Sequence, residues 1–322
     1  MSNNPEGKSD FLPKVSVIVP IYNGEKDLPD LIECLRSQNY PATQVEYLLV
    51  DNNSSDRTSE ILEAAVKKNS PEQPTIHNLR EDNIQSSYAA RNLGIKAAQN
   101  NILCFTDADC RPDPDWLKQL VQPFTNPDVA IVAGKIASVP GETLLEKYAD
   151  KYEVLSEKYA IEHPFCPYGQ TANLAIRKQA LEKVGLFRPY LTTGGDADIC
   201  WRILRETNWQ IELATEAIIR HRHRSTLSGF LSQWRRYGNS NRYLHELHGV
   251  DLAPKMTTKY MIYRLSRWLL KELPINSIKA IVGKETAIEL FKTPIELLGS
   301  QARSAGQKES KLSELAKEIE RL

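Results

Sequence analysis

The sequence predicts an α/β fold, in which a mostly parallel sheet carries helices on both faces and a helical C-terminal extension follows. Two observations predict this fold. Short β-branched, apolar runs alternate with segments of helical periodicity near the start of the chain, and such runs are typical of strands buried on both faces. Beyond about Leu227 only helical patterns remain. We therefore expect a disordered head over 1–13, an α/β domain over 14–240 and a helical extension over 241–322.

The first strands and helices can be assigned in order. We expect a strand over 15–20 ("VSVIVP") and then a helix in "EKDLPDLIECLRSQ", where Pro29 is tolerated only in the first turn. A second strand covers 45–52, and "SSDRTSEILEAAVKK" starts with capping residues and continues as a helix. A short strand near Ile76, a helix over 86–99 and the strand "NILCFTD" complete three strand–helix alternations.

The pattern changes after Val129. "VAIVAGKI" predicts a strand, and 142–160 predicts a long charged helix. "CPYGQTANLAIRKQALEKVG" predicts a loop and then a helix that ends at Gly185. "TGGDADICWRILRET" turns from a loop into a helix, and "IELATEAIIRHRHRST" predicts a strand before a basic loop. The last stretch, "SKLSELAKEIERL", is typical of a solvated helix or a short coil-forming segment.

The composition is that of an ordinary globular protein, with 41% hydrophobic and 25% charged residues. The formal net charge is zero, so no overall field attracts nucleic acid. Five cysteines without CxxC spacing favour reduced thiols over disulfides or a zinc site. The first residues lack the apolar core of a secretory signal, and no apolar run reaches the roughly 18 residues of a membrane-spanning helix. We expect a cytoplasmic protein.

Paired carboxylates follow the strand "NILCFTD". Asp107 and Asp109 stand one residue apart in "CFTDADC", although the Asp-x-Asp pattern is short and occurs elsewhere in the chain. Ligands of parallel α/β sheets bind beyond the carboxyl ends of the strands. Asp51 and Asp107 both fall at such ends, whereas Asp115 falls at the start of a helix. The architecture therefore favours chemistry at Asp107 and Asp109 over a loop-capping role.

Six segments resemble those of the family 2 glycosyltransferases in their order and approximate spacing. They are "VSVIVPIYNGEKDLPDLIECLRSQNYP", "YLLVDNNSSDRT", "AARNLGIKAA", "FTDADC", "TANLAIRKQALEKVGLF" and "GGDADICWRIL". The resemblance covers about 14–240 and implies the GT-A fold, which is Rossmann-like. It also implies an inverting transfer of a sugar from a nucleotide diphosphate to an acceptor hydroxyl of a polysaccharide, a glycolipid or another cell-surface glycan.

The resemblance implies a divalent cation, Mg²⁺ or Mn²⁺, at the DADC turn. Loss of the nucleotide diphosphate leaves growing negative charge, which a hard cation held by oxygen ligands neutralises. Asp107 and Asp109 would supply those oxygens, with Asp109 as the more direct ligand. His221 is a further candidate ligand because it follows a strand directly. The basic loop over 220–226 has alternative roles, either holding a diphosphate or an anionic acceptor lipid or being simply solvated.

Asp51 resembles the residue that hydrogen-bonds the nucleotide base in this family. A second acid often follows it, and Asn52 stands at that position here. Arg91 would pair with the diphosphate through its planar donors, or be an exposed helix charge. The residues expected to flank the base or the ribose are Pro20, Tyr22 and Asn23.

Asp196 is the expected general base. Members of the family usually have Gly-Glu-Asp at this position, and this chain has Gly194, Gly195 and Asp196, so the glutamate is missing. A base must lie within hydrogen-bond reach of the acceptor hydroxyl, and the entry to a helix is suitable for that. The helix N-terminus would lower its basicity. Asp198 would support Asp196 or cap the helix.

Further contacts to an acceptor or a phosphate are expected in the second half of the chain. "SQWRRYG" has the residues of a Gln-x-x-Arg-Trp element of processive relatives in rearranged order, which favours a non-processive enzyme. Nucleic acid is disfavoured because the basic patch is short and has little aromatic interleaving. The candidate residues are Asn173, His223, Gln233, Arg235 and Arg236.

Two interpretations of the C-terminal extension stay open. Its helices pack on the catalytic domain or pair two subunits as a homodimer. Alternatively, an amphipathic face with Trp268, Arg264, Arg267 and Lys271 rests peripherally on the inner face of the membrane, near a lipid-linked acceptor.

Two other functions compete with a transferase that binds a nucleotide-sugar donor. A nucleotidyltransferase would need a Gly-rich phosphate loop with a lysine near the first strand, and "VPIYNGEKDLP" is not one. A nucleotide-sugar-binding scaffold without turnover is favoured only by the glutamate missing before Asp196. A redox dinucleotide-binding protein is disfavoured because no GxGxxG follows the first strand.

Overall fold

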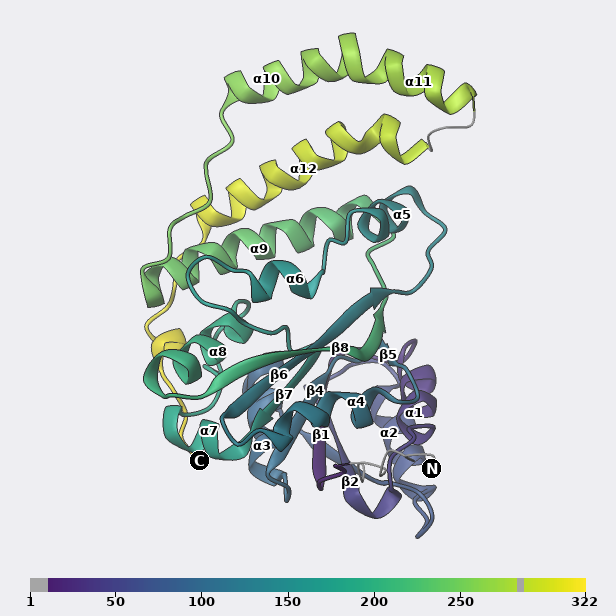
Figure 1. Cartoon of the computed structure of the whole chain (residues 1–322), viewed down its shortest axis with the longest axis vertical. Helices are drawn as coiled ribbons and strands as arrows, with labels where there is room; N and C mark the ends of the chain where they lie inside the picture. Colours follow the sequence, from purple (N-terminus) through teal and green to yellow (C-terminus); the bar gives the residue numbers. More distant parts are fainter. Residues whose placement is uncertain (1–10, 283–286) are drawn as a thin grey trace, which may run out of the picture.

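The computed structural model describes residues 11–282 and 287–322, and most of the expected head lies outside them. The described residues build an eight-stranded sheet in the order β3-β2-β1-β4-β7-β6-β8-β5 (Figure 1). The strands are β1 (Val15–Ile21), β2 (Val45–Asp51), β3 (Thr75–Arg80), β4 (Ile102–Thr106), β5 (Cys110–Pro112), β6 (Val129–Ser138), β7 (Asn173–Arg177) and β8 (Gln210–His221).

Helices cover both faces of this sheet, as the sequence predicts. Alternate side chains of β1 belong to different cores: Val17 and Val19 lie in one hydrophobic cluster and Ile18 in the other. Because β1, β2, β3 and β4 pair in parallel, their carboxyl ends meet at one edge. The helices that pack on or extend from the sheet are α1 (Leu28–Arg36), α2 (Thr58–Lys67), α3 (Ser87–Ala97), α4 (Trp116–Val121), α5 (Leu144–Lys151), α6 (Glu157–Ile161), α7 (Lys178–Val184), α8 (Gly195–Glu206), α9 (Leu227–His248), α10 (Thr258–Arg267), α11 (Leu273–Ile281) and α12 (Ala287–Glu309).

Two expected elements differ in the structure. The segment expected to be a loop and a helix contains β7, which is antiparallel to both β4 and β6. Its apolar run is short and continues directly into α7, so periodicity could not separate strand from helix. The long helix expected over 142–160 is two helices, α5 and α6. Glu153, between them, has a φ of 45°, a left-handed conformation that a continuous helix cannot contain.

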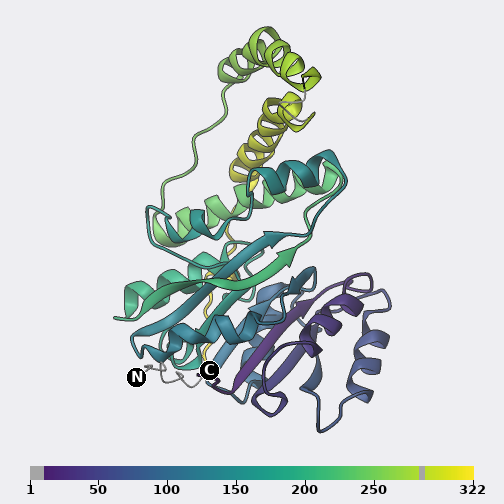
Figure 2. The ribbon, with the colours of Figure 1, turned by 45° about the vertical axis from the view of Figure 1, so that its right-hand side comes forward.

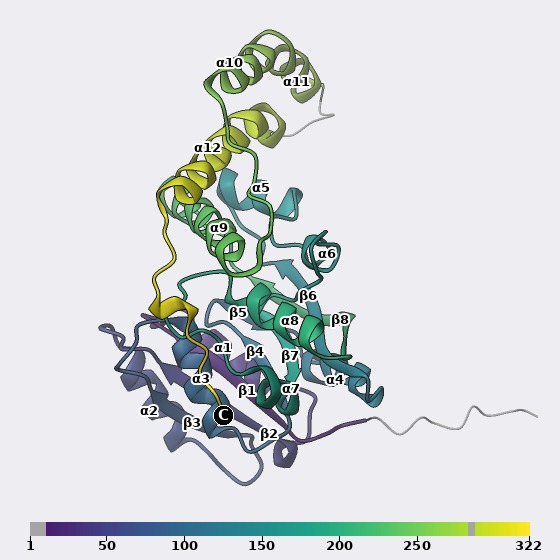
Figure 3. The same cartoon turned by 90° about the vertical axis from the view of Figure 1, so that its left-hand side faces the viewer.

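The C-terminal stretch is neither a solvated helix nor a coil-forming segment. Apart from a short 3₁₀ turn it is irregular, and it runs back from α12 along the α/β domain (Figure 3). Leu312 and Ala316 are buried in the core that covers one face of the sheet. The Leu186 amide donates to the Glu320 carbonyl oxygen at 2.8 Å, and Lys96 forms an ion pair with the Glu320 carboxylate. This tail therefore binds the extension to the domain.

The extension is also joined to the domain through α9, so the expected boundary at residue 240 falls inside that helix. Helix α12 lies along α9 (Figure 1). The two backbones approach closely at glycines: a Cβ on Gly238 would lie 2.0 Å from the Arg303 carbonyl oxygen, and one on Gly306 would lie 2.1 Å from that of Arg235. Within the described ranges, none of the helices combines the length and hydropathy needed to span a bilayer.

Gly238→Ala should destabilise the protein, because the added methyl group collides with backbone that cannot move without separating α9 from α12. We expect the free energy of unfolding to fall by about 1–3 kcal/mol, the usual cost of overpacking. Urea unfolding followed by circular dichroism measures it. Ser228→Ala, at an exposed position of the same helix, is the matched control; equal midpoints for the two variants would contradict this description of the helix contact.

Candidate active site

A cleft of about 810 Å³ opens at the carboxyl ends of β1 and β4 and is bounded on its other side by α8 and α9. Residues that are distant in the sequence meet in it because parallel strands end at one edge and the later helices pack across that edge. Of the residues predicted from the sequence, those that line the cleft are Pro20, Tyr22, Asn23, Arg91, Asp107, Asp109, Asp196, His221, Gln233 and Arg236.

Asp107 and Arg91 form a close ion pair at the floor of the cleft. An Nη of Arg91 lies 2.5 Å from Oδ1 of Asp107, and the Arg91 side chain is only 4% exposed. Arg91 is therefore not an exposed helix charge. Burial raises the pKa of Asp107, and Asp109 and Asp196 raise it further, while Arg91 opposes the shift. The guanidinium thus offsets part of the cost of a carboxylate placed among other acids.

Asp109 faces His221, which the sheet brings to the DADC turn. In the antiparallel pair of β5 and β8, Cys110 stands opposite His221. The distance from Asp109 Oδ2 to His221 Nε2 is 3.5 Å, and to an Nη of Arg224 it is 3.7 Å. Although burial opposes ionisation, His221 and Arg224 lower the pKa of Asp109 to about 2. Asp109 is therefore an anion at neutral pH.

These residues fit a hard divalent cation that shares its ligands with a substrate. Asp109 offers an anionic oxygen, His221 an imidazole nitrogen, and Asp107 stands two positions before Asp109. Nδ1 of His221 is buried without a hydrogen-bond partner. Within 11–282 and 287–322, no group of three or more His, Cys, Asp or Glu side chains is arranged to hold an ion alone. Phosphate and water oxygens would have to complete such a shell.

Asp196 stands at the start of α8 and is held by two hydrogen bonds. Its Oδ1 accepts from the Tyr88 hydroxyl and its Oδ2 from the Thr171 amide, both at 3.2 Å. The Tyr88 hydroxyl in turn accepts from the Gly195 amide at 2.9 Å. Burial, and then the charge of Asp196, raise the pKa of Tyr88. The hydroxyl therefore stays protonated and donates a hydrogen bond to the carboxylate.

Tyr88 accounts for the glycine at position 195, where the resemblance leads us to expect a glutamate. A Cβ on Gly195 would lie 2.6 Å from atoms of the Tyr88 ring, so any larger side chain would displace that ring. The aromatic ring thus occupies the space beside Asp196. The sequence analysis missed Tyr88. The only signal was indirect, because a bulky aromatic precedes "AARN" in the same chain that lacks the glutamate.

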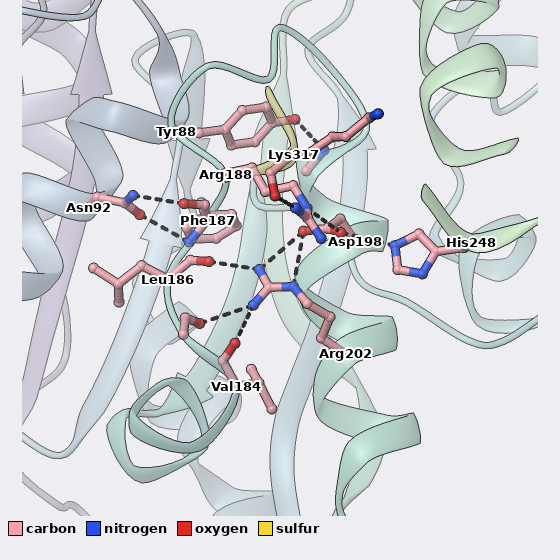
Figure 4. A network of polar contacts seen from close by, with 12 residues as sticks. Tyr88, Asn92, Val184, Leu186, Phe187, Arg188, Asp198, Arg202, His248 and Lys317 are labelled. Atoms are coloured by element: carbon pink, nitrogen blue, oxygen red, sulfur yellow. Dashed lines mark hydrogen bonds and ion pairs between the residues drawn. The ribbon is translucent and has the colours of Figure 1, made fainter. Parts of the chain in front are cut away.

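Asp198 does not line the cleft, and no side chain makes a cap hydrogen bond at the start of α8. Asp198 is fully buried. Its carboxylate accepts from Nε of Arg188 at 3.0 Å, from Nε of Arg202 at 3.1 Å and from Nε2 of His248 at 2.9 Å (Figure 4). These partners lower the pKa of Asp198 to about 2 despite its burial. Asp198 is therefore a structural anion that holds three parts of the chain together: helix α8, the segment that follows α7, and helix α9.

Three of the residues expected to contact an acceptor or a phosphate do not line the cleft. Asn173 is buried: its amide donates to the carbonyl oxygens of Lys135 and Ala217 and accepts from Trp116, which uses its hydrogen-bonding groups in the sheet. The other two lie outside the cleft. His223 bonds to Ser138 at 2.8 Å, with a pKa lowered to about 4 by burial and by His221, and Arg235 pairs with Glu309 of α12.

Asp51 is buried at the end of β2 and does not line the cleft. Its Oδ1 accepts from the Ser54 amide at 3.0 Å, and its register partner in β1 is Ile21, next to the cleft-lining Tyr22. The neighbouring Asn52 donates to the carbonyl oxygens of Glu81 and Ile84. A carboxylate has no N–H to make these bonds, which explains the amide at this position.

The comparisons with known proteins agree with this arrangement. Residues 16–185 match glycosyl transferase family 2, and 102–281 match glycosyl transferase family group 2. The chain therefore belongs to glycosyl transferase family 2.

Glycosyltransferase AglE of Haloferax volcanii is 37% identical over 187 residues, which are 58% of this chain and 59% of AglE. The pre-mycofactocin glycosyltransferase of Mycobacterium tuberculosis is 28% identical over 247 residues, 74% of this chain and 49% of that protein. The chain thus spans between about half and three fifths of the length of these relatives.

Solved structures confirm the GT-A fold. The mannosyltransferase PcManGT from Pyrobaculum calidifontis, in complex with GDP-Man and Mn²⁺, superposes with a TM-score of 0.63 at 18% identity, over 93% of this chain and 88% of that one. TarS of Staphylococcus aureus, residues 1–349 with UDP-GlcNAc, gives 0.53 at 18% identity, over 92% and 90%. At these identities the likeness concerns the fold alone.

Asp198→Asn should destabilise the chain strongly, because it leaves two buried arginines without their anion. We expect a loss of roughly 3–5 kcal/mol at neutral pH. Since the folded pKa of Asp198 lies below its usual value, its contribution is complete above about pH 4 and is lost as the pH falls towards 2. Urea unfolding between pH 7 and pH 3 measures this, with the exposed Asp128→Asn as the control. If the free energy of unfolding of Asp198→Asn stays below that of the control by the same amount at every pH, the assignment of Asp198 as a buried anion is contradicted.

Proposed function

We propose that this chain is an inverting, metal-dependent glycosyltransferase that moves a sugar from a nucleotide-diphosphate donor to an acceptor hydroxyl. One observation supports it above the others: the Asp109–His221 pair and Asp196 line the same cleft. A cation-holding pair suits the leaving diphosphate, and a carboxylate across the cleft suits a general base. The acceptor class we propose is a polysaccharide, a glycolipid or another lipid-linked glycan.

The donor nucleotide would lie over the ends of β1 and β2. Pro20, Tyr22 and Asn23 line that end of the cleft, and the Tyr22 ring is 55% exposed and free to contact a base or a ribose. Asp51 is buried at the neighbouring strand end, so a hydrogen bond to the base would require the base to reach beyond the cleft lining towards β2. The structural neighbours solved with GDP-Man and with UDP-GlcNAc support a nucleotide-sugar donor. Arg224 and Arg236 give the cleft positive charge for a diphosphate.

Asp109 and His221 would hold a Mg²⁺ or Mn²⁺ ion. Asp107, which forms an ion pair with Arg91, would lie beside them. A bound divalent cation neutralises the charge that develops on the departing diphosphate. Asp109 remains ionised for this purpose because its pKa is lowered to about 2. The Arg91–Asp107 pair keeps the turn in place, since the guanidinium is buried and fixed against the Tyr88 ring at 5.5 Å.

Asp196 would take the proton of the acceptor hydroxyl. The acceptor oxygen forms a bond to the anomeric carbon, the bond from that carbon to the diphosphate breaks, and the diphosphate leaves with the electron pair. A single displacement inverts the configuration. Tyr88 and the Thr171 amide each occupy one lone pair of the carboxylate, which orients it towards the cleft and leaves other lone pairs for the acceptor.

Variants of the two acids should separate donor binding from chemistry. With Asp109→Asn we expect Mn²⁺-dependent stabilisation by the donor to disappear. With Asp196→Asn we expect that stabilisation to persist while transfer falls by about 10²–10⁴-fold, the usual contribution of a general base. Thermal shift with UDP-, GDP- and dTDP-sugars, with and without Mn²⁺, measures the first effect, and release of nucleoside diphosphate measures the second.

Asp128→Asn is the control for both variants of the acids. Donor binding by the unaltered chain without any turnover would favour the nucleotide-sugar-binding scaffold. Release of inorganic diphosphate from a nucleoside triphosphate supplied with a sugar phosphate would favour a nucleotidyltransferase.

Tyr88→Phe should impair Asp196 as a base, because it removes the hydroxyl of residue 88 and keeps the aromatic ring. The ring still fills the space beside Gly195, but Asp196 loses the hydroxyl that donates to its Oδ1, so the carboxylate is less firmly oriented towards the acceptor. We expect about a tenfold lower kcat and an unchanged KM for the donor. Tyr190→Phe, on an exposed tyrosine outside the cleft, is the control. A kcat equal to that of the unaltered chain, or a loss confined to KM, would count against a positioning role for Tyr88.

A further inference from the structure

Helices α10 and α11 form an arm at the end of the molecule farthest from the sheet (Figures 1 and 2). A five-residue π-helical turn, Trp268–Glu272, joins them, and no residue of either helix is buried. The arm carries several of the most exposed large apolar side chains of the described residues, including Leu270 at 78% and Ile281 at 85% exposure. We call the following set the apolar arm face: Ile262, Tyr263, Leu269, Leu270, Ile278 and Ile281.

Polar side chains of the arm point the other way, towards α12. Arg264 donates to the Glu296 carboxylate at 3.0 Å, and the Trp268 indole donates to the Leu290 carbonyl oxygen at 2.8 Å. Glu272 accepts from the Thr293 hydroxyl at 2.6 Å. The usual pattern of a surface helix is the reverse, with apolar residues inward and polar residues outward. These contacts fix the arm so that the apolar arm face points away from the protein.

The arm is also the most basic part of the extension. Residues 255–282 contain six Lys or Arg and one acidic residue, so their net charge is +5 in a chain whose net charge is zero. Arg264 and Arg267 are paired with acids. Lys259 and Lys271 are exposed, and they stand three residues before Ile262 and directly after Leu270. Apolar side chains set among lysines are typical of helices that rest on an anionic bilayer.

We propose that α10 and α11 dock on the surface of an anionic lipid bilayer through the apolar arm face. Charge decides between this partner and a second copy of the chain: pairing the face on itself would bring two segments of net charge +5 together, whereas anionic headgroups neutralise them. The depth of contact is interfacial, because the arm presents one face and no membrane-spanning helix is found among the described residues.

A second cavity lies at the base of the arm. Its volume is about 460 Å³, and its lining includes Met256 and Tyr260 at the start of the arm. Trp234 and Arg303 line both this cavity and the catalytic cleft, so the two are neighbours. A bilayer bound to the arm would therefore lie beside a cavity that adjoins the cleft. In this respect the inference rests on the proposed function, since it would bring a lipid-linked acceptor near the cleft.

Vesicle co-sedimentation of the full chain tests the docking. We expect binding to vesicles of equimolar phosphatidylcholine and phosphatidylglycerol, with weaker binding to pure phosphatidylcholine or at high salt. The double variant Leu270→Gln/Ile281→Gln should lower the partition coefficient at least about tenfold, because two large apolar side chains no longer leave water. Lys259→Glu/Lys271→Glu should abolish the preference for the anionic lipid.

Leu315→Gln removes an exposed leucine of the C-terminal tail, far along the chain from the arm, and is the matched control. All these positions are exposed, so circular dichroism and donor hydrolysis should be unchanged. Binding equal to that of Leu315→Gln would overturn the proposal. So would a vesicle-free dimer in light scattering that Leu270→Gln/Ile281→Gln dissociates. Asp196→Asn should still bind vesicles, so failure of the proposed chemistry is distinguishable from failure of docking.

Discussion

The buried carboxylate of Asp198 is the interaction on which the site depends. It is fully enclosed, and three cationic or hydrogen-bonding partners come to it from different segments: Arg188 after α7, Arg202 within α8 and His248 at the end of α9. Arg188 also donates to the Lys317 carbonyl oxygen of the tail. Arg202 donates to three carbonyl oxygens, of Val184, Gly185 and Leu186. One anion thus fixes the start of α8, where Asp196 stands two residues earlier. A buried charge with fewer partners would cost stability instead.

The register of the sheet positions the metal-binding side of the proposed site. Because β5 pairs with β8, a histidine near residue 220 reaches the DADC turn without any proximity in the sequence. Asp196 faces this turn from the helix side, and the Tyr88 ring packs beside Gly195, where the resemblance leads us to expect a glutamate. The missing glutamate was the sole argument for a scaffold without turnover. Because the Tyr88 ring fills this space and its hydroxyl donates to Asp196, the glycine is compatible with a positioned carboxylate.

The sequence predicted those parts of the fold and site that depend on local pattern or on segment order. Strands β1, β2 and β4 were recognisable as apolar runs, and the order of motifs brought Asp107, Asp109 and Asp196 to one cleft. Strand β7 was missed because a short apolar run merges into the next helix. The sequence did not indicate that Asn173 and Asp198 lie outside the cleft or that Tyr88 lies in it, because burial and hydrogen-bond partners come from tertiary packing, which residue type alone does not reveal. The tail was misjudged for the same reason, since Leu312 and Ala316 bury against segments far away in the chain.

The claim at the centre is that a cation at Asp109 and a base at Asp196 act on one sugar from opposite sides of the cleft. The most direct test is a crystal structure with Mn²⁺ and a nucleotide sugar whose transfer is blocked, read by anomalous scattering. We expect the manganese peak between Asp109 and His221, the diphosphate against it, and the anomeric carbon facing Asp196 across the space of one hydroxyl. A manganese peak away from these two residues, or a sugar directed away from Asp196, would contradict the account.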